Sequence, residues 1–166
     1  MLGYFSVYKS GDEKYSGGVL IINEKGMPVS FKYTSPIKPT KIQKIIYGNN
    51  LKSYIASEII GKKISEIAKD VEVLLVQENE TLDFLSTDKP VAQLVSSKAL
   101  SESSSFNGKE GIITLGQNYS GKISFSSEVS QELFNKISGL AEIFDILEPF
   151  VRLNEALSYV CSSEEG

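Results

Sequence analysis

The sequence predicts an α+β protein, in which a mostly antiparallel sheet carries a central helix pair and C-terminal helices packed on it. Three observations support this fold class. A hairpin pattern over Tyr15–Thr34 precedes a long run with helical periodicity, Leu51–Lys69. Short β-patterns come next, and the chain ends in amphipathic helices. Strand groups that alternate with helix groups are typical of helices packed on one antiparallel sheet. We therefore expect residues 1–166 to form a single globular domain.

The first predicted strands come from β-branched and alternating segments. Val19–Asn23 is a β-branched run, and Val29–Tyr33 alternates apolar with polar residues. Between them, Gly26 can adopt a positive φ and so supports a turn. Residues Tyr4–Tyr8 can add an earlier strand.

A proline-bounded connector then leads to the predicted helix pair. Pro36 and Pro39 fix their own φ angles and favour extended geometry in the residues before them. A short helix is expected over Thr40–Tyr47, and the glycine that follows it suits a helix end. Asn50 is the expected N-cap of the longer helix, Leu51–Lys69.

The second half is predicted to add strands, one loop and two helices. The expected strands are Val71–Gln77, Leu82–Ser86, Val91–Ser96, Ile112–Leu115 and Lys122–Ser126. A mobile serine-rich loop is expected at about 96–111. Ser126 or Ser127 is the expected cap of an amphipathic helix, and a final helix is expected over Phe150–Tyr159. Periodicity predicts one core formed by Phe31, Ile42, Ile46, Ile55, Ile59, Val73, Leu75, Leu133, Ile137 and Phe144.

The composition excludes much familiar active-site chemistry. The chain has no histidine and one cysteine, Cys161, so it cannot form a Ser-His-Asp triad, a His-ligated zinc site or an intrachain disulfide. We identify no catalytic residue and expect no metal and no cofactor. Five acids near predicted strand ends could contribute to a Mg²⁺ site, but their spacing is not diagnostic: Asp12, Glu13, Glu24, Asp70 and Glu72. A ribonuclease-H-like site would favour aspartate at the end of the strand that this chain ends with Asn23.

Charge is divided unequally along the chain. Residues 1–70 carry 11 lysines and 6 acids, which gives 11 − 6 = +5, and residues 71–166 carry 6 basic and 15 acidic groups, which gives 6 − 15 = −9. Two interpretations remain open. The basic stretch Lys32–Lys63 could bind an anion, or the acidic half could neutralise it within the fold. Of the two, we expect neutralisation.

The basic stretch also contains aromatic residues, a combination that nucleic-acid surfaces use. Lysines recur every three residues around the predicted short helix, and tyrosines could stack on bases. Alternatively, the lysines only face water, or they dock an acidic protein. The candidate binding residues are Lys32, Tyr33, Lys38, Lys41, Lys44, Tyr47 and Lys52.

Two segments resemble an uncharacterised prokaryotic family of hypothetical proteins. Gly26–Gly48 (GMPVSFKYTSPIKPTKIQKIIYG) has a Gly-x-Pro turn, a Phe-basic-Tyr-Thr strand, Pro-x-basic-Pro, and a helix ending Gln-x-x-hydrophobic-Tyr-Gly. Leu147–Arg152 (LEPFVR) is similar to that family too. The resemblance implies a globular domain and no particular activity. In element order alone, the chain also resembles the profilin-like group (longin and roadblock modules).

These observations lead to three functional hypotheses. The first is a cytoplasmic protein-interaction domain that is non-catalytic and so not an enzyme, and that self-associates or binds a protein partner. The alternative is a nucleic-acid-binding accessory protein that uses Lys32–Lys63, and the third is a metal-dependent hydrolase. The first residues lack a signal-peptide pattern and no apolar run is long enough to span a membrane, so we expect no membrane partner.

Overall fold

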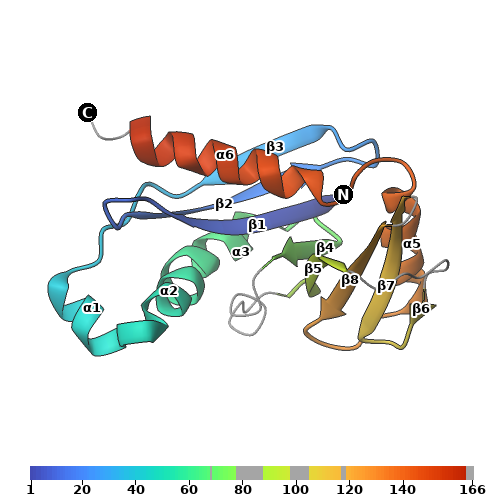
Figure 1. Ribbon diagram of the computed structural model, residues 1–166, viewed down its shortest axis with the longest axis horizontal. Helices are drawn as coiled ribbons and strands as arrows, with labels where there is room; N and C mark the ends of the chain where they lie inside the picture. Colours follow the sequence, from blue (N-terminus) through green and yellow to red (C-terminus); the bar gives the residue numbers. More distant parts are fainter. Residues whose placement is uncertain (68, 78–87, 98–104, 117–118, 164–166) are drawn as a thin grey trace.

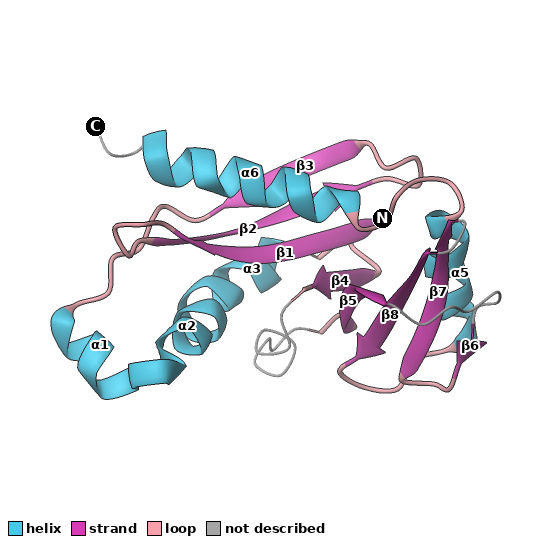
Figure 2. Ribbon diagram, viewed as in Figure 1, coloured by secondary structure: helices cyan, strands magenta, loops and turns pink. Residues whose placement is uncertain are grey.

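The computed structural model describes the chain except for residues 68, 78–87, 98–104, 117–118 and 164–166. Its strands form one eight-stranded sheet in the order β3-β2-β1-β4-β5-β8-β7-β6. Five of the strand pairings are antiparallel, and the β1–β4 and β4–β5 pairings are parallel. The predicted α+β class with a mostly antiparallel sheet is therefore confirmed (Figure 2).

The first three strands form an antiparallel meander at one side of the sheet. They are β1 (Leu2–Lys9), β2 (Tyr15–Ile22) and β3 (Pro28–Tyr33). The turn between β2 and β3 uses Gly26 at a φ of 76°, as predicted. The side-chain oxygen of Asn23 accepts hydrogen bonds from the backbone N–H groups of Lys25 and Met27, so Asn23 has a turn-forming role.

The remaining strands continue the sheet from β1. Parallel strands β4 (Val73–Val76) and β5 (Val91–Ser97) lead to the antiparallel strands β6 (Ser105–Phe106), β7 (Glu110–Gly116) and β8 (Tyr119–Phe125). Strands thus occupy both ends of the segment that we predicted as a loop at about 96–111. Its middle, like the predicted strand Leu82–Ser86, lies outside the described residues.

Helices cover both faces of the sheet, as Figure 1 shows. On one face, α5 (Gln131–Ala141) and α6 (Glu148–Ser163) pack on alternate residues of the strands, such as Tyr4 and Leu20. The opposite face includes Phe5 and Val19 and is covered by the helical segment that contains Ile55 and Ile60. The core consequently consists of two apolar layers separated by the sheet, and the prediction of one core is corrected.

The predicted helix pair is more irregular than expected. The short helix α1 (Lys41–Tyr47) begins at Thr40, whose side chain forms a capping box with Gln43. A single 3₁₀ turn, η1 (Gly48–Asn50), then leads into a continuous helical run. This run comprises α2 (Leu51–Tyr54), a π-helical stretch η2 (Ile55–Gly61) and α3 (Lys62–Ile67). Asn50 makes no side-chain cap, because the chain enters α2 directly from the 3₁₀ turn.

Two predicted core residues are in fact on the surface. Ile42 and Ile46 are each 72% exposed, and Ile45 is 69% exposed. The reason is the position of α1, which extends from the corner of the molecule and buries none of its residues (Figure 1). Farther along the chain, Ser130 caps α5, in place of the predicted Ser126 or Ser127.

The two segments that resemble the prokaryotic family touch each other in the fold. Arg152 donates a hydrogen bond from Nη2 to the carbonyl oxygen of Gly26 at 3.1 Å, and its Nε contacts Glu148 at 2.8 Å. The ring of Phe144 also packs beside Gly26, where an added Cβ would lie 3.0 Å from the ring. Arg152 therefore connects the β2–β3 turn to α6. The family resemblance itself stays a prediction.

Candidate functional site

Several lysines gather where the β1–β2 turn meets the connector to α1. Tyr15, at the start of β2, forms a backbone bridge with Ile37, and this bridge places the connector beside the turn. Lys9 lies at the end of β1, with its Nζ 5.9 Å from the centre of the Tyr15 ring. Lys14 pairs with Asp12 at 3.3 Å. We call the set Lys9, Lys14, Lys38, Lys41 and Lys44 the basic end.

Glu13 shows how close three members of the basic end are. Its carboxylate accepts a hydrogen bond from the Nζ of Lys44. That hydrogen bond and the charge of Lys44 lower the pKa of Glu13, with further contributions from the charges of Lys9 and Lys38. Glu13 is also held at a φ of 64°, a left-handed conformation that is uncommon outside glycine. One carboxylate on the turn is therefore surrounded by lysines from three segments.

In the described part of the chain, two lysines of the basic end pair with acids of the first half, Lys14 with Asp12 and Lys44 with Glu13. Our expectation that the acidic half neutralises the basic stretch stays a prediction. Lys62 of the basic stretch pairs with Glu58, which also belongs to the first half. Glu72 of the second half instead pairs with Lys136. In the part of the chain that the structure describes, Lys38 and Lys41 are exposed and form no ion pair.

The predicted binding residues do not all share one surface. Lys32 and Tyr33 are adjacent in β3 and so point to opposite faces of the sheet. Tyr33 stacks on Phe31, with ring centroids 5.3 Å apart, and Phe31 packs against the core under α6. Tyr33 therefore lies away from the basic end. The spacing of residues in the sequence did not show this separation.

Two other predicted residues lie near the base of α1. Tyr47 stacks on Tyr54 with ring centroids 4.0 Å apart, and a hydrogen bond to Tyr54 raises the pKa of the Tyr47 hydroxyl. Lys52 is half-buried in α2. The structure thus joins Lys38, Lys41 and Lys44 to one end of the molecule and connects α1 to α2 through a pair of rings.

Residues outside the predicted set complete this surface. Lys9 and Lys14 reach it through the β1–β2 turn, and no local sequence signal predicts that approach. The isoleucines of α1 did carry a signal, their helical periodicity, but we interpreted it as a buried face. Periodicity identifies the apolar side of a helix and does not show what covers it.

The carboxylates proposed for a metal site are divided between different parts of the fold: Glu24 and Glu72 are both near Lys136, whereas Asp12 and Glu13 lie in the β1–β2 turn. Asp12, Glu13 and Glu72 each pair with a cation, and Glu24 and Asp70 are exposed. Among the described residues, no three His, Cys, Asp or Glu side chains lie close enough to hold a metal ion. No helix in the described part of the chain is both long and apolar enough to cross a membrane.

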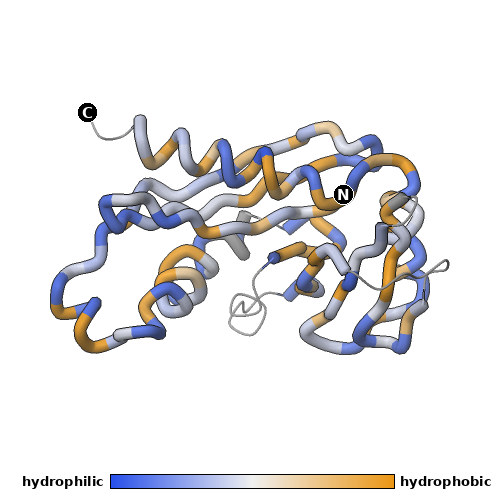
Figure 3. Tube along the Cα trace, in the orientation of Figure 1, coloured by the Kyte–Doolittle hydropathy of each residue, from blue (hydrophilic) through white to orange (hydrophobic). Residues whose placement is uncertain are grey.

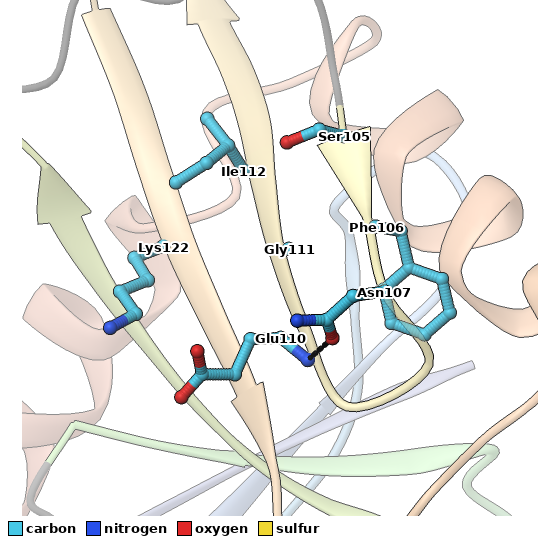
Figure 4. Close-up of a pocket in the computed structure, with 7 residues that line it drawn as sticks. All are labelled: Ser105, Phe106, Asn107, Glu110, Gly111, Ile112 and Lys122. Carbon is cyan, nitrogen blue, oxygen red and sulfur yellow. Dashed lines mark hydrogen bonds between the residues drawn. The ribbon is translucent and has the colours of Figure 1, made fainter.

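Two of the pockets that the described residues form have a volume of about 290 Å³ each. One is lined by β6, β7 and β8 and includes Glu110 and Lys122 from neighbouring strands (Figure 4). Its drawn hydrogen bond runs from the Glu110 backbone N–H to the side chain of Asn107, so this contact shapes a turn. The other lies between the β1–β2 turn and α6, beside the buried Cys161.

Comparison with solved structures finds the same fold among nucleases. A structure described as human ENDOV matches with a TM-score of 0.66 at 11% identity, covering 99% of this chain and 85% of that one. Endonuclease V of Ciona intestinalis, in complex with a 24mer DNA containing an inosine followed by a ribo-adenosine, matches with a TM-score of 0.63 at 14% identity. That match covers 99% of this chain and 87% of the other. No family model matches the chain, and no curated protein does.

These findings correct our first functional hypothesis. The structures reported above are of endonuclease V, and they include complexes with bound DNA. The hypothesis of a non-catalytic protein-interaction domain is therefore wrong, and the comparisons give no support to self-association. They favour the nucleic-acid alternative.

Proposed function

We propose that this protein binds nucleic acid and that the basic end contacts the phosphates. The main supporting observation is that Lys9, Lys38 and Lys44 all lie near the carboxylate of Glu13. The basic end holds five lysines against two acids, Asp12 and Glu13, which gives 5 − 2 = +3 for a protein whose net charge is −4. A local concentration of positive charge on an acidic protein directs a polyanion to that location.

The fold supports the same proposal. The endonuclease V structures that match this chain over 99% of its length include complexes with inosine-containing DNA. The β1–β2 turn and the connector to α1 belong to the matched length, so the basic end lies on a scaffold shared with DNA-bound proteins. At 11–14% sequence identity, the comparison supports the fold only. The proposal of nucleic-acid binding therefore depends on the lysines of this chain.

Salt-dependent binding tests this function. A fluorescein-labelled mixed-sequence oligonucleotide is titrated with the protein at several salt concentrations, and anisotropy gives Kd. The slope of log affinity against log salt should be about −0.7 for each phosphate contacted on a single strand. Lys38→Glu with Lys41→Glu should reduce the magnitude of that slope by about 1.4, because two contacts are lost.

A matched pair of charge reversals controls for overall charge. Lys25 is exposed on the β2–β3 turn, at the other end of the hairpin, and Lys109 is exposed on the turn before β7. Lys25→Glu with Lys109→Glu changes the net charge by the same amount and should leave the slope unaltered. Equal losses in the two double variants would refute a localised phosphate site, and an absence of binding by the parent protein would refute the proposed function.

A further inference from the structure

Helix α1 presents an apolar face that nothing in the described structure covers. Ile42, Ile45 and Ile46 are 69–72% exposed, and α1 has no buried residue. Figure 3 shows this apolar stretch at the corner of the molecule, away from the sheet. Scattered single apolar residues are normal on a surface, but three at the spacing of one helix face form a patch.

The patch is held in place. The capping box between Thr40 and Gln43 satisfies backbone and side-chain groups at the start of α1. Lys44 connects the middle of the helix to Glu13 on the β1–β2 turn. At its end, Tyr47 stacks on Tyr54 of α2. Three separate contacts thus support a short helix whose isoleucines remain in water, so the exposed face is a persistent feature of the fold.

The neighbouring charges narrow the choice of ligand. Lys41 belongs to α1 itself and Lys38 to the connector just before it, and both are exposed. A ligand on this face must therefore offer apolar surface and negative charge together. A stacked duplex presents phosphates and hides the faces of its bases, whereas a single strand exposes base faces beside its phosphates.

We propose that the isoleucine face of α1 binds unpaired bases, so that the preferred ligand of the basic end is single-stranded nucleic acid. This inference rests on the proposed function and specifies its substrate class. Phosphates lie along Lys38 and Lys41, and the bases turn toward Ile42, Ile45 and Ile46. The lysines supply the salt-dependent part of the affinity, and the isoleucines supply a part that salt does not screen.

The test separates these two parts. Anisotropy is measured with a 12-nucleotide mixed-sequence single strand and with a 12-base-pair duplex of the same sequence. We expect the single strand to bind at least tenfold more tightly. Ile42→Ser with Ile46→Ser should weaken single-strand binding at least tenfold and leave the salt slope unchanged, because no phosphate contact is lost.

A control pair uses two other exposed apolar residues. Ile143 is 64% exposed and Val151 is 56% exposed, and neither belongs to α1. Ile143→Ser with Val151→Ser should change single-strand affinity less than twofold. Circular dichroism and thermal melting of both double variants should match the parent, which shows that any loss of binding is not a loss of folding.

The other possible outcomes contradict either the proposed function or this inference. If the parent binds neither oligonucleotide, the proposed function fails. If single strand and duplex bind equally well and the α1 variant keeps full affinity, the function stands and this inference fails. Loss of binding to anionic phosphatidylserine vesicles in the α1 variant, with oligonucleotide affinity retained, would assign the isoleucines to a lipid surface and equally overturn it.

Discussion

Gly17 offers a direct test of how the π-helical stretch η2 packs on the sheet. It lies in β2, where a Cβ added to it would be 2.1 Å from Cγ2 of Ile60 and 3.2 Å from Cβ of the same residue. Ile60 is fully buried in η2, and its β-branched side chain has little freedom to rotate away. Gly17→Ala should therefore force η2 away from β2 and destabilise the protein by about 1–3 kcal/mol, the usual cost of overpacking.

Urea unfolding, monitored by circular dichroism, measures this loss of stability. With an m-value of about 2 kcal/mol/M, a loss of about 2 kcal/mol lowers the midpoint by about 1 M. Gly139 provides the matched control, because an added Cβ there meets nothing within 4 Å and the residue is exposed in α5. Gly139→Ala should raise stability by about 0.5–1 kcal/mol through helix propensity.

A double-mutant cycle identifies the responsible contact. Ile60→Ala alone should cost about 2–5 kcal/mol, since it leaves a cavity. Combined with Gly17→Ala, the 2.1 Å contact with Cγ2 disappears, only the milder 3.2 Å approach to the Cβ of residue 60 remains, and the new methyl group fills part of that cavity. The double variant should then be more stable than the sum of the single losses by at least about 1 kcal/mol. Additive losses, or a Gly17→Ala variant as stable as the parent, would refute the proposed packing.

Three further predictions concern side chains at the basic end and in the core. Glu13→Gln should tighten single-strand binding and increase the salt slope by about 0.7, because it frees Lys44 to meet a phosphate; an unchanged slope would place Lys44 outside the site. Since the folded pKa of Glu13 is lowered, its ion pair should be fully formed above the ordinary carboxyl pKa and lost as the pH falls through the lowered value, which a carbon NMR titration of its carboxylate can follow. Tyr4 is buried and its hydroxyl donates to the carbonyl oxygen of Ile146 at 2.6 Å, so Tyr4→Phe should destabilise the protein by about 1–3 kcal/mol in urea unfolding, whereas no loss would show that the carbonyl finds another donor.

Local patterns predicted most of the strands and their turns. The alternation in Val29–Tyr33 and the glycine at position 26 describe a hairpin that needs no distant partner, and the structure contains it. The parallel pairing of β1 with β4 is different, because Leu2 meets Val73 across about seventy residues. No local pattern specifies that partner, so the order of the sheet could not be predicted.

The candidate site was predicted only in part, for a related reason. Lys38, Lys41 and Lys44 are close in sequence and remain close in space. Lys9 joins them through the bridge between Tyr15 and Ile37, a tertiary contact without a sequence signature. The alternation of β3 separates Tyr33 from Lys32 although the two are adjacent.

The position of α6 has a consequence for how this protein folds during synthesis. The helix packs on β1 and β2. Hydrogen bonds connect β1 to the segment just before α6, through Tyr4 and Ile146, and to the middle of α6, through Ser6 and Asn154. The sequence separations are 142 and 148 residues. At about 5–20 residues per second, the ribosome needs on the order of ten seconds to supply this cover after the first hairpin emerges. The apolar face of the nascent hairpin stays exposed for that time, so the synthesis of α6 controls when β1 and β2 become protected.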